Sequence, residues 1–334
     1  MKIKTIVRVF FKIFFSWVIM LTILFFWIQN VNKNSYTRQM KYDLVDDKKI
    51  EEKSNYKIIS KNKKEFIEKK NKEENKKEIN SIYKREFLIY IVNNALNKQH
   101  YSPSKYWDIS YQKLCHYYKN YCNIIDVEND FSEKEKIYFT AISIYLIKFL
   151  EKNFHNIDSK VYYIKLQKDK SWRRWYAWHH SIVMNIKKNM TYKQFLEVLT
   201  HEIGHIIDLW IIEWDSWFKD WTYTEFWKKS FAKNDKSLEF YKLSWNSEKI
   251  KNPYSYAKDF VSGYALTDPF EDFAETFNMY VNHNAVFIKM TKESNILKKK
   301  YNFINNIMNW NYLSSDRNFK YKKDFRPRDS TKMK

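Results

Sequence analysis

Glycine is nearly absent from this chain, which has 2 glycines and 4 prolines but 13 tryptophans among its 334 residues. An average protein contains about 7% glycine. The sequence has no P-loop, dinucleotide fingerprint or nucleophile elbow, the glycine-containing motifs of nucleotide-binding proteins and α/β-hydrolases. The two glycines present, Gly204 and Gly263, are expected to allow a close backbone approach and a positive-φ turn, respectively.

Several tryptophans stand where turns would favour glycine, in SWRRWYAWHH (171–180) and EWDSWFKDWT (213–222). One hypothesis is that some of them are UGA codons that the source organism reads as glycine, which the codons would decide. The other is a tryptophan-rich surface that grips ligand or membrane. Because both stay open, no binding site is assigned to these residues.

Cysteine is also scarce. Cys115 and Cys122 are the two present, so a zinc ribbon, which needs four ligands in paired clusters, is excluded. On one continuous helix their Cα atoms would lie about 10 Å apart, too far for a disulfide. In a loop they could pair, and an exterior location would permit it. The sequence leaves both arrangements open.

Acidic residues are outnumbered by basic ones. The chain has 60 lysines and arginines and 39 aspartates and glutamates, which give a formal net charge of +21. A chain of this charge is drawn to anionic surfaces, and an anionic envelope polymer is one expected partner. The hydrophobic fraction of 44% is enough for a substantial core.

The N-terminus carries a long apolar run. Basic residues within the first twelve positions precede an uncharged run over 13–28, which with its apolar flanks is long enough to span a bilayer. The run does not end in the small residues of a cleavable signal peptide. Residues 1–30 are therefore predicted to be a single-pass anchor in the cell membrane. Because the basic flank is N-terminal, the rest of the chain is expected outside the cytoplasm.

Composition divides the remainder into three parts. Residues 31–84 are polar and lysine-rich without apolar periodicity, which is typical of a charged spacer. Residues 85–313 contain the apolar patterns of a folded domain. Residues 314–334 resemble the spacer and are expected to form a solvated basic tail.

Within the domain, helices and strands follow from apolar spacing. Ser132 and Glu135 form a capping-box pattern that predicts a helix over 132–154. Residues 160–166 and 181–186 are rich in β-branched or alternating apolar residues and predict strands. A second helix is expected over 191–209. The expected fold class is α+β, mostly helical with a small sheet.

The second helix contains the sequence HEIGH. On a helix, His201 and His205 lie on one face about 6 Å apart and can direct two imidazoles at one zinc ion. Glu202 is rotated by about 100° from His201, so it cannot be a ligand with both histidines. It can take a proton from the attacking water and act as general base. A half-exposed pair of surface histidines would show the same spacing.

A catalytic zinc ion needs a third protein ligand. Downstream, Asp268 is a predicted N-cap with Pro269 at the first helical position. Glu271 and Glu275 share one face of this helix beside an apolar stripe. Glu271 is the predicted third ligand, and Glu275 is predicted to orient a ligand histidine. The alternative for Glu271 is a capping box with Asp268.

Together, HEIGH and SGYALTDPFEDFAETF (262–277) resemble the gluzincin metallopeptidases related to the catalytic domain of anthrax toxin lethal factor and to the Pro-Pro endopeptidases. That family pairs HExxH with a downstream E-x-F-A-E helix and a tyrosine seven residues before its first glutamate. The resemblance covers about residues 190–285 and implies a zincin-like fold. It implies zinc ligands His201, His205 and Glu271, base Glu202, and Tyr264 as donor to the developing oxyanion, with Glu275 behind the ligands.

Three further histidines are weaker candidates. His179 and His180 precede a predicted strand and would line a substrate groove, or be ordinary loop residues. His283 follows the second ligand helix and would approach the site, or simply interact with the helix C-terminus.

The predicted function is a membrane-anchored zinc endopeptidase that hydrolyses peptide bonds of surface or secreted polypeptides. One alternative is an anchored basic binding protein with a non-catalytic zincin-like fold. The presence of Glu202, Tyr264 and a complete ligand set argues against it. Another is an intracellular DNA-repair protease of the SprT-like kind, which the anchor and the lack of a zinc ribbon oppose. Nucleic acid is therefore not favoured as a partner.

Overall fold

By its contacts the chain divides into two compact units, residues 1–78 and 79–334. The computed structural model describes the following residues, all in the second unit: 81, 83–96, 109–155, 157–161, 163–168, 175–178, 180–212, 219–225, 229–314 and 321–333. The predicted membrane anchor and most of the predicted spacer lie outside them. Among the described residues, none of the helices is both long and apolar enough to cross a membrane.

The described part begins with helical residues 83–95, followed by two short helices, α3 (Tyr111–Tyr117) and α4 (Lys119–Cys122). The chain turns at Tyr118 between them, so Cys115 and Cys122 do not share one continuous helix. Their Cα atoms lie 5.5 Å apart and the two residues form a disulfide. Of the two arrangements that the sequence left open, the structure has the paired one.

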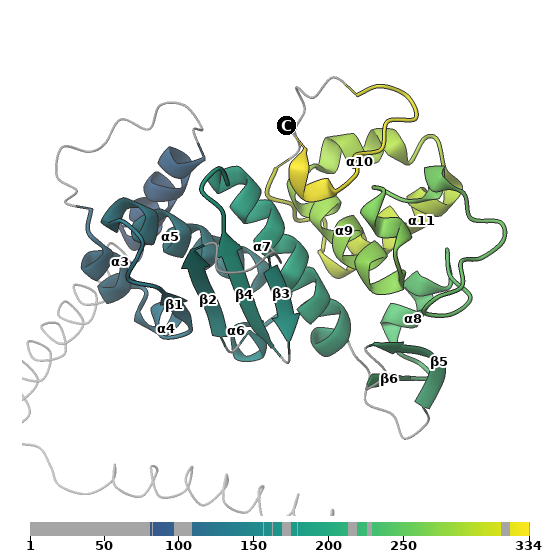
Figure 1. Ribbon diagram of the computed structural model, residues 1–334, viewed down its shortest axis with the longest axis horizontal. Helices are drawn as coiled ribbons and strands as arrows, with labels where there is room; N and C mark the ends of the chain where they lie inside the picture. The colour runs from purple at the N-terminus through teal and green to yellow at the C-terminus, as the bar shows by residue number, and fades with distance from the viewer. Residues whose placement is uncertain are drawn as a thin grey trace, which may run out of the picture. The chain divides into compact units, whose positions relative to one another are not determined.

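A four-stranded sheet forms the first layer, in the order β1-β2-β4-β3 (Figure 1). Its strands are β1 (Ile125–Val127), β2 (Tyr163–Lys168), β3 (Trp175–Trp178) and β4 (Ser181–Ile186). β1, β2 and β4 are parallel, while β3 pairs antiparallel with β4. Alternate side chains, such as Ile164 and Leu166 on β2 and Ile182 and Met184 on β4, point into the core and are fully buried.

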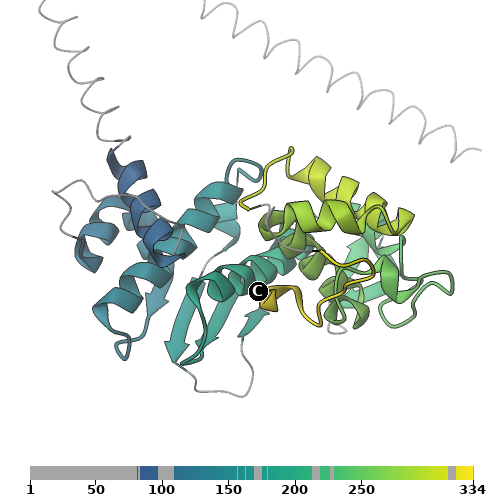
Figure 2. The same ribbon diagram turned by 90° about the horizontal axis from the view of Figure 1, so that it is seen from above.

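Two long helices cover one face of this sheet (Figure 2). α5 (Glu133–Leu150) follows β1, and its predicted capping box is present because Ser132 and Glu135 bond reciprocally. The short helix α6 (Ile157–Lys160) leads into β2. α7 (Tyr192–Ile206) follows β4 directly and continues without a break into a π-helical turn, η1 (Ile207–Ile211).

The second half of the described chain is mainly helical. It contains a two-stranded antiparallel sheet, β5 (Lys219–Glu225) with β6 (Lys229–Ala232), and then α8 (Lys236–Tyr241) and the 3-10 turns η2 (Ala257–Asp259) and η3 (Tyr264–Leu266). α9 (Pro269–Asn282), α10 (Asn284–Met290), α11 (Asn295–Ile307) and the turn η4 (Ser330–Lys332) follow. The described residues are thus helix-rich with two small sheets, an α+β arrangement.

α7 and α9 pack directly against each other and bring the two halves of the sequence motif together (Figure 1). Gly204 lies at the crossing, where a Cβ atom would sit 3.2 Å from the Ala274 Cα. The expected close approach at Gly204 is therefore confirmed. Farther along, Asn282 Nδ2 donates to Thr200 Oγ1 across the same interface (3.1 Å), a hydrogen bond that contributes about 1 kcal/mol.

Two expectations are wrong. Gly263 has φ −66°, an ordinary right-handed conformation, so no positive-φ turn exists there. Residues 321–333 are not a solvated tail throughout, because Ser330 is fully buried and Met333 nearly so. The basic composition concealed this burial, since the lysines of the segment stay exposed while Asp329, Ser330 and Thr331 are buried.

Candidate metal centre

The two histidines of HEIGH lie on the face of α7 that meets α9. α7 begins at the predicted place, because the Thr191 hydroxyl accepts a hydrogen bond from the Gln194 backbone N–H (3.1 Å). From there the helical period brings His201 and His205 onto one face, with ring centroids 4.9 Å apart. His201 is buried, and the His205 side chain is 12% exposed. The pair therefore lies buried in the interface between α7 and α9 and not on an exposed helix edge.

Glu271 enters the site from the first turn of α9. The helix starts as predicted, with Asp268 as N-cap accepting hydrogen bonds from the backbone N–H groups of Phe270 (3.0 Å) and Glu271 (2.8 Å). Pro269 occupies the first helical position, where its missing N–H is not needed. The Glu271 side chain extends toward the histidines, which leaves only its backbone in the cap.

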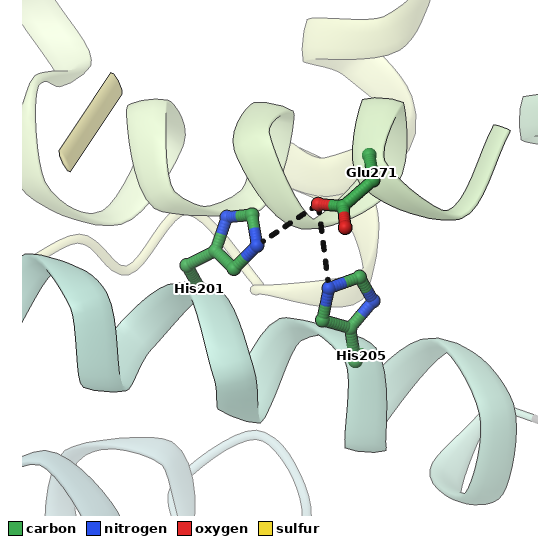
Figure 3. Close-up of side chains that lie close together, drawn as sticks. All are labelled: His201, His205 and Glu271. Atoms are coloured by element: carbon green, nitrogen blue, oxygen red, sulfur yellow. Dashed lines mark ion pairs between the residues drawn. The ribbon is translucent and has the colours of Figure 1, made fainter. Parts of the chain in front are cut away.

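The three side chains converge on one point (Figure 3). Glu271 Oε2 lies 3.1 Å from His201 Nε2 and 3.6 Å from His205 Nε2. Ligand atoms of the three residues all lie within 4.8 Å of one another, which is the spacing of a metal-binding group. Two imidazole nitrogens and one carboxylate oxygen are the ligands that zinc takes in catalytic sites.

The two histidines and Glu271 shift one another's pKa values. Burial lowers the pKa of His205, but the Glu271 carboxylate outweighs burial and raises that pKa to about 9. Burial also opposes the charged form of His201, yet Glu271 and Glu275 hold its pKa well above the ordinary value. Despite its own burial, Glu271 has a pKa well below normal because of the two histidines. A divalent cation between these groups would replace the protons on the histidines, so metal binding releases protons.

Buried polar atoms support the fit of a metal to these residues. Glu271 Oε2 is buried and makes no hydrogen bond of good geometry with any residue that the structure describes. Without metal, this oxygen is compensated by its ion pairs with the two imidazoles, and a cation held by all three groups would replace those ion pairs. The donor set and its spacing therefore fit zinc.

Glu202 lies beside the ligands but not among them. Its side chain is almost fully buried, and burial raises the pKa of its carboxyl to about 7, with the Glu271 charge adding to the effect. The two histidines act in the opposite direction. Glu202 is not one of the three potential ligands, and its role as general base stays a prediction.

Tyr264, in η3, closes the other side of the site. Its hydroxyl donates a hydrogen bond to Glu271 Oε1 (3.0 Å), and its ring centroid lies 6.1 Å from that of His201. Burial and the Glu271 charge raise the pKa of the phenol far above its ordinary value, which keeps the O–H protonated. The residue is 38% exposed, so it contacts both the solvent and the site.

Glu275 lies one turn beyond Glu271 and behind His201. Its Oε1 is 3.0 Å from His201 Nδ1, the nitrogen that does not face Glu271. Its Oε2 accepts hydrogen bonds from the Ser262 hydroxyl (2.5 Å) and from the Ser330 backbone N–H (2.7 Å). Such an arrangement fixes the ring orientation and the tautomer of a ligand histidine. Sequence reasoning missed both serines, because nothing in the local pattern links them to α9.

His180 and His283, two of the other candidate histidines, lie elsewhere. The His283 Nε2 is 3.2 Å from Glu197 Oε1, in a buried pair between the far ends of α9 and α7. The His180 ring packs against that of Trp210, with centroids 4.4 Å apart. His179 lies outside the described residues. Neither His180 nor His283 belongs to the group of three potential ligands.

Residues 180–318 match the model of a family described as "Putative zinc-binding metallo-peptidase". The match covers under half of the chain and includes α7, α9 and the three ligand residues. No curated protein matches the sequence. The match supports a metallopeptidase family, and its description agrees with the His-His-Glu group in naming zinc as the cofactor.

Proposed function

We propose that this protein is a zinc metalloendopeptidase of the gluzincin type, related to the lethal factor and Pro-Pro endopeptidase group. The observation that carries the proposal is the convergence of His201, His205 and Glu271 from two helices that are far apart in sequence. A mixed sheet whose antiparallel edge strand β3 is paired with the strand before the ligand helix supports a zincin-like fold.

Each residue at the site has a distinct task. When bound, zinc supplies the positive charge that makes a water molecule nucleophilic at neutral pH. Glu202 takes the proton of the attacking water and passes it to the leaving amine. The Tyr264 hydroxyl, which donates to Glu271 in the structure, turns to donate to the carbonyl oxygen as that oxygen becomes negative. One such preorganised donor typically lowers the barrier by about 3 kcal/mol. Glu275 holds His201 in the orientation that ligation requires.

The substrate class and location follow from the same proposal. The substrates are polypeptides at the cell surface or in secreted form, and the domain is held to the membrane by residues 1–30. The basic flank and apolar run of the N-terminus support this topology. A reporter fused after residue 40 tests it, because an internal reporter would contradict an exterior domain.

The test of catalysis is the variant Glu202→Gln. It keeps the shape of the side chain and all three ligands but removes the base, so zinc should remain bound while cleavage of a peptide library falls by at least about 100-fold. The matched control is Glu239→Gln, on α8. Zinc binding without any cleavage by the wild type would favour the non-catalytic binding protein instead.

A further inference from the structure

The C-terminal segment lies against the metal centre, although the family match ends at residue 318. The turn η4 contacts both α7 and α9, and Figure 2 shows it, in dark yellow near the chain end, close to α7. Asp329, Ser330 and Thr331 are 5%, 0% and 1% exposed. A segment this deeply buried at the junction of the two ligand helices contributes to their arrangement.

The segment contacts the carboxylate behind His201. The Ser330 backbone N–H donates to Glu275 Oε2 (2.7 Å), while the other oxygen of Glu275 lies 3.0 Å from His201 Nδ1. The Ser330 hydroxyl accepts a hydrogen bond from Asn278 Nδ2 (2.8 Å), which ties the segment to α9 a second time. Hydrogen bonds to an ionised acceptor are roughly twice as strong as neutral ones. Glu275 is thus the one residue between the Ser330 N–H and the predicted ligand His201.

The same segment fixes the backbone around Tyr264. The N–H groups of Gly263 and Tyr264 donate to the carbonyl oxygens of Pro327 and Arg328, both at 2.8 Å. A Cβ atom at Gly263 would lie 3.4 Å from the Arg328 oxygen, so the two segments lie side by side at an ordinary contact distance. The loop that carries Tyr264 therefore takes its position from residues near the C-terminus.

We propose that residues 327–331 are a positioning element of the metal centre. Ser330 N–H orients Glu275 and through it His201, and the carbonyl groups at 327 and 328 hold the Tyr264 loop. The role for Tyr264 rests on the proposed peptidase function, whereas the role for Glu275 requires only that the site binds zinc.

Ser330→Pro removes the relevant N–H together with the hydroxyl that accepts from Asn278. Ser330 is the first residue of η4, where a proline is tolerated, and Asp329 has φ −154° and ψ 123°, the extended conformation that precedes proline readily. Ser330→Ala is the matched control, because it removes the hydroxyl and keeps the N–H. The measurement is zinc affinity of the full chain by competition with a chelator.

The expected result is zinc affinity lowered by about 10- to 100-fold in Ser330→Pro and close to wild type in Ser330→Ala, the usual effect of losing a group that orients a ligand. The far-UV circular dichroism spectra of the two zinc-free variants should be the same, which shows that both have the same secondary structure. Equal zinc affinity in the two variants would overturn the proposal. Because the readout is zinc affinity, a wild type that binds zinc but cleaves nothing would end the peptidase proposal and leave this test intact.

Hydrogen exchange on the wild-type chain gives a second readout that needs no variant. Zinc binding and docking of the segment must strengthen each other by the same factor. Amides of residues 328–331 should therefore exchange more slowly with zinc bound than after its removal. The factor should equal the ratio of the zinc affinities of the wild type and Ser330→Pro. Fast exchange at these amides, unchanged by zinc, contradicts the proposal even if Ser330→Pro fails to fold.

Discussion

At the scale of single residues, the candidate site depends on buried carboxylates and the groups that offset their desolvation. Glu271 and Glu275 face histidines, and Asp272, between them in sequence, forms a buried ion pair with Lys300 (2.6 Å) and accepts from the Trp245 ring N–H (3.0 Å). Removing one partner of such a pair costs about 3–5 kcal/mol, since the other charge is left buried. Asp208 differs, because the charge of His205 offsets only part of the effect of its burial.

Asp208 gives a prediction about pH. Burial raises the pKa of its carboxyl to about 8, although the Tyr241 hydroxyl donates to it. Between pH 4 and 8 the folded state keeps a proton that the unfolded state releases, so this group makes the free energy of unfolding fall as pH rises, by up to about 1.4 kcal/mol per pH unit. Asp208→Asn should flatten that slope in urea titrations of the zinc-free chain.

Asp130→Asn, the same substitution at an exposed position, is the matched control. If Asp208→Asn has the wild-type slope between pH 5 and 8, Asp208 is already ionised in the folded protein.

Two tryptophans differ in a way that bears on the codon hypothesis. Trp245 is 2% exposed and its ring N–H donates to a buried carboxylate, a role that only tryptophan fills there. Trp310 is 75% exposed with φ 64°, a conformation that favours glycine, three residues after the end of α11. A reassigned codon is therefore expected at position 310 and UGG at position 245.

At the scale of elements, the contact between α7 and α9 determines whether the ligands meet. The two helices come close because residue 204 has no side chain, and the Ala274 backbone and the Phe277 ring occupy the space where one would be. A change at this crossing moves both histidines relative to Glu271 without altering any ligand.

Gly204→Val should therefore weaken both folding and metal binding. The added methyl groups would overlap the Ala274 backbone, and overpacking of this kind costs about 1–3 kcal/mol. Chemical denaturation and zinc titration measure the two effects. Gly263→Ala is the control, because its Cβ would lie 3.4 Å from the nearest atom, an ordinary contact. A Gly204→Val variant with wild-type stability and zinc affinity would show that the helices do not meet as described.

Elements with strong local signals were predictable from the sequence. Capping residues placed the starts of α5 and α9 correctly, α7 begins where a helix over 191–209 was expected, and β4 has its predicted bounds, Ser181–Ile186. The strands β3 and β5 were not predicted, because each lies in a tryptophan-rich segment without clear alternation. The π-helical turn that continues α7 also has no local sequence signal.

At the scale of the whole molecule, the parts that the sequence could not predict are contacts between distant segments. HEIGH and the Glu271 helix were linked by a known pattern, so the ligand set could be proposed before any coordinates. The C-terminal segment had no such pattern, and its lysines and arginines suggested solvent. A domain ending at residue 313 would omit Ser330, which contacts Glu275.

The central claim is that three side chains from α7 and α9 bind one zinc ion, and the most direct test is zinc stoichiometry and affinity in the full chain with and without Glu271→Ala. The wild type should bind one zinc ion per chain. Glu271→Ala should bind at least about 100-fold more weakly, beyond the usual cost of losing an orienting group, while Glu202→Gln should bind like the wild type. Unchanged zinc affinity in Glu271→Ala would contradict the account.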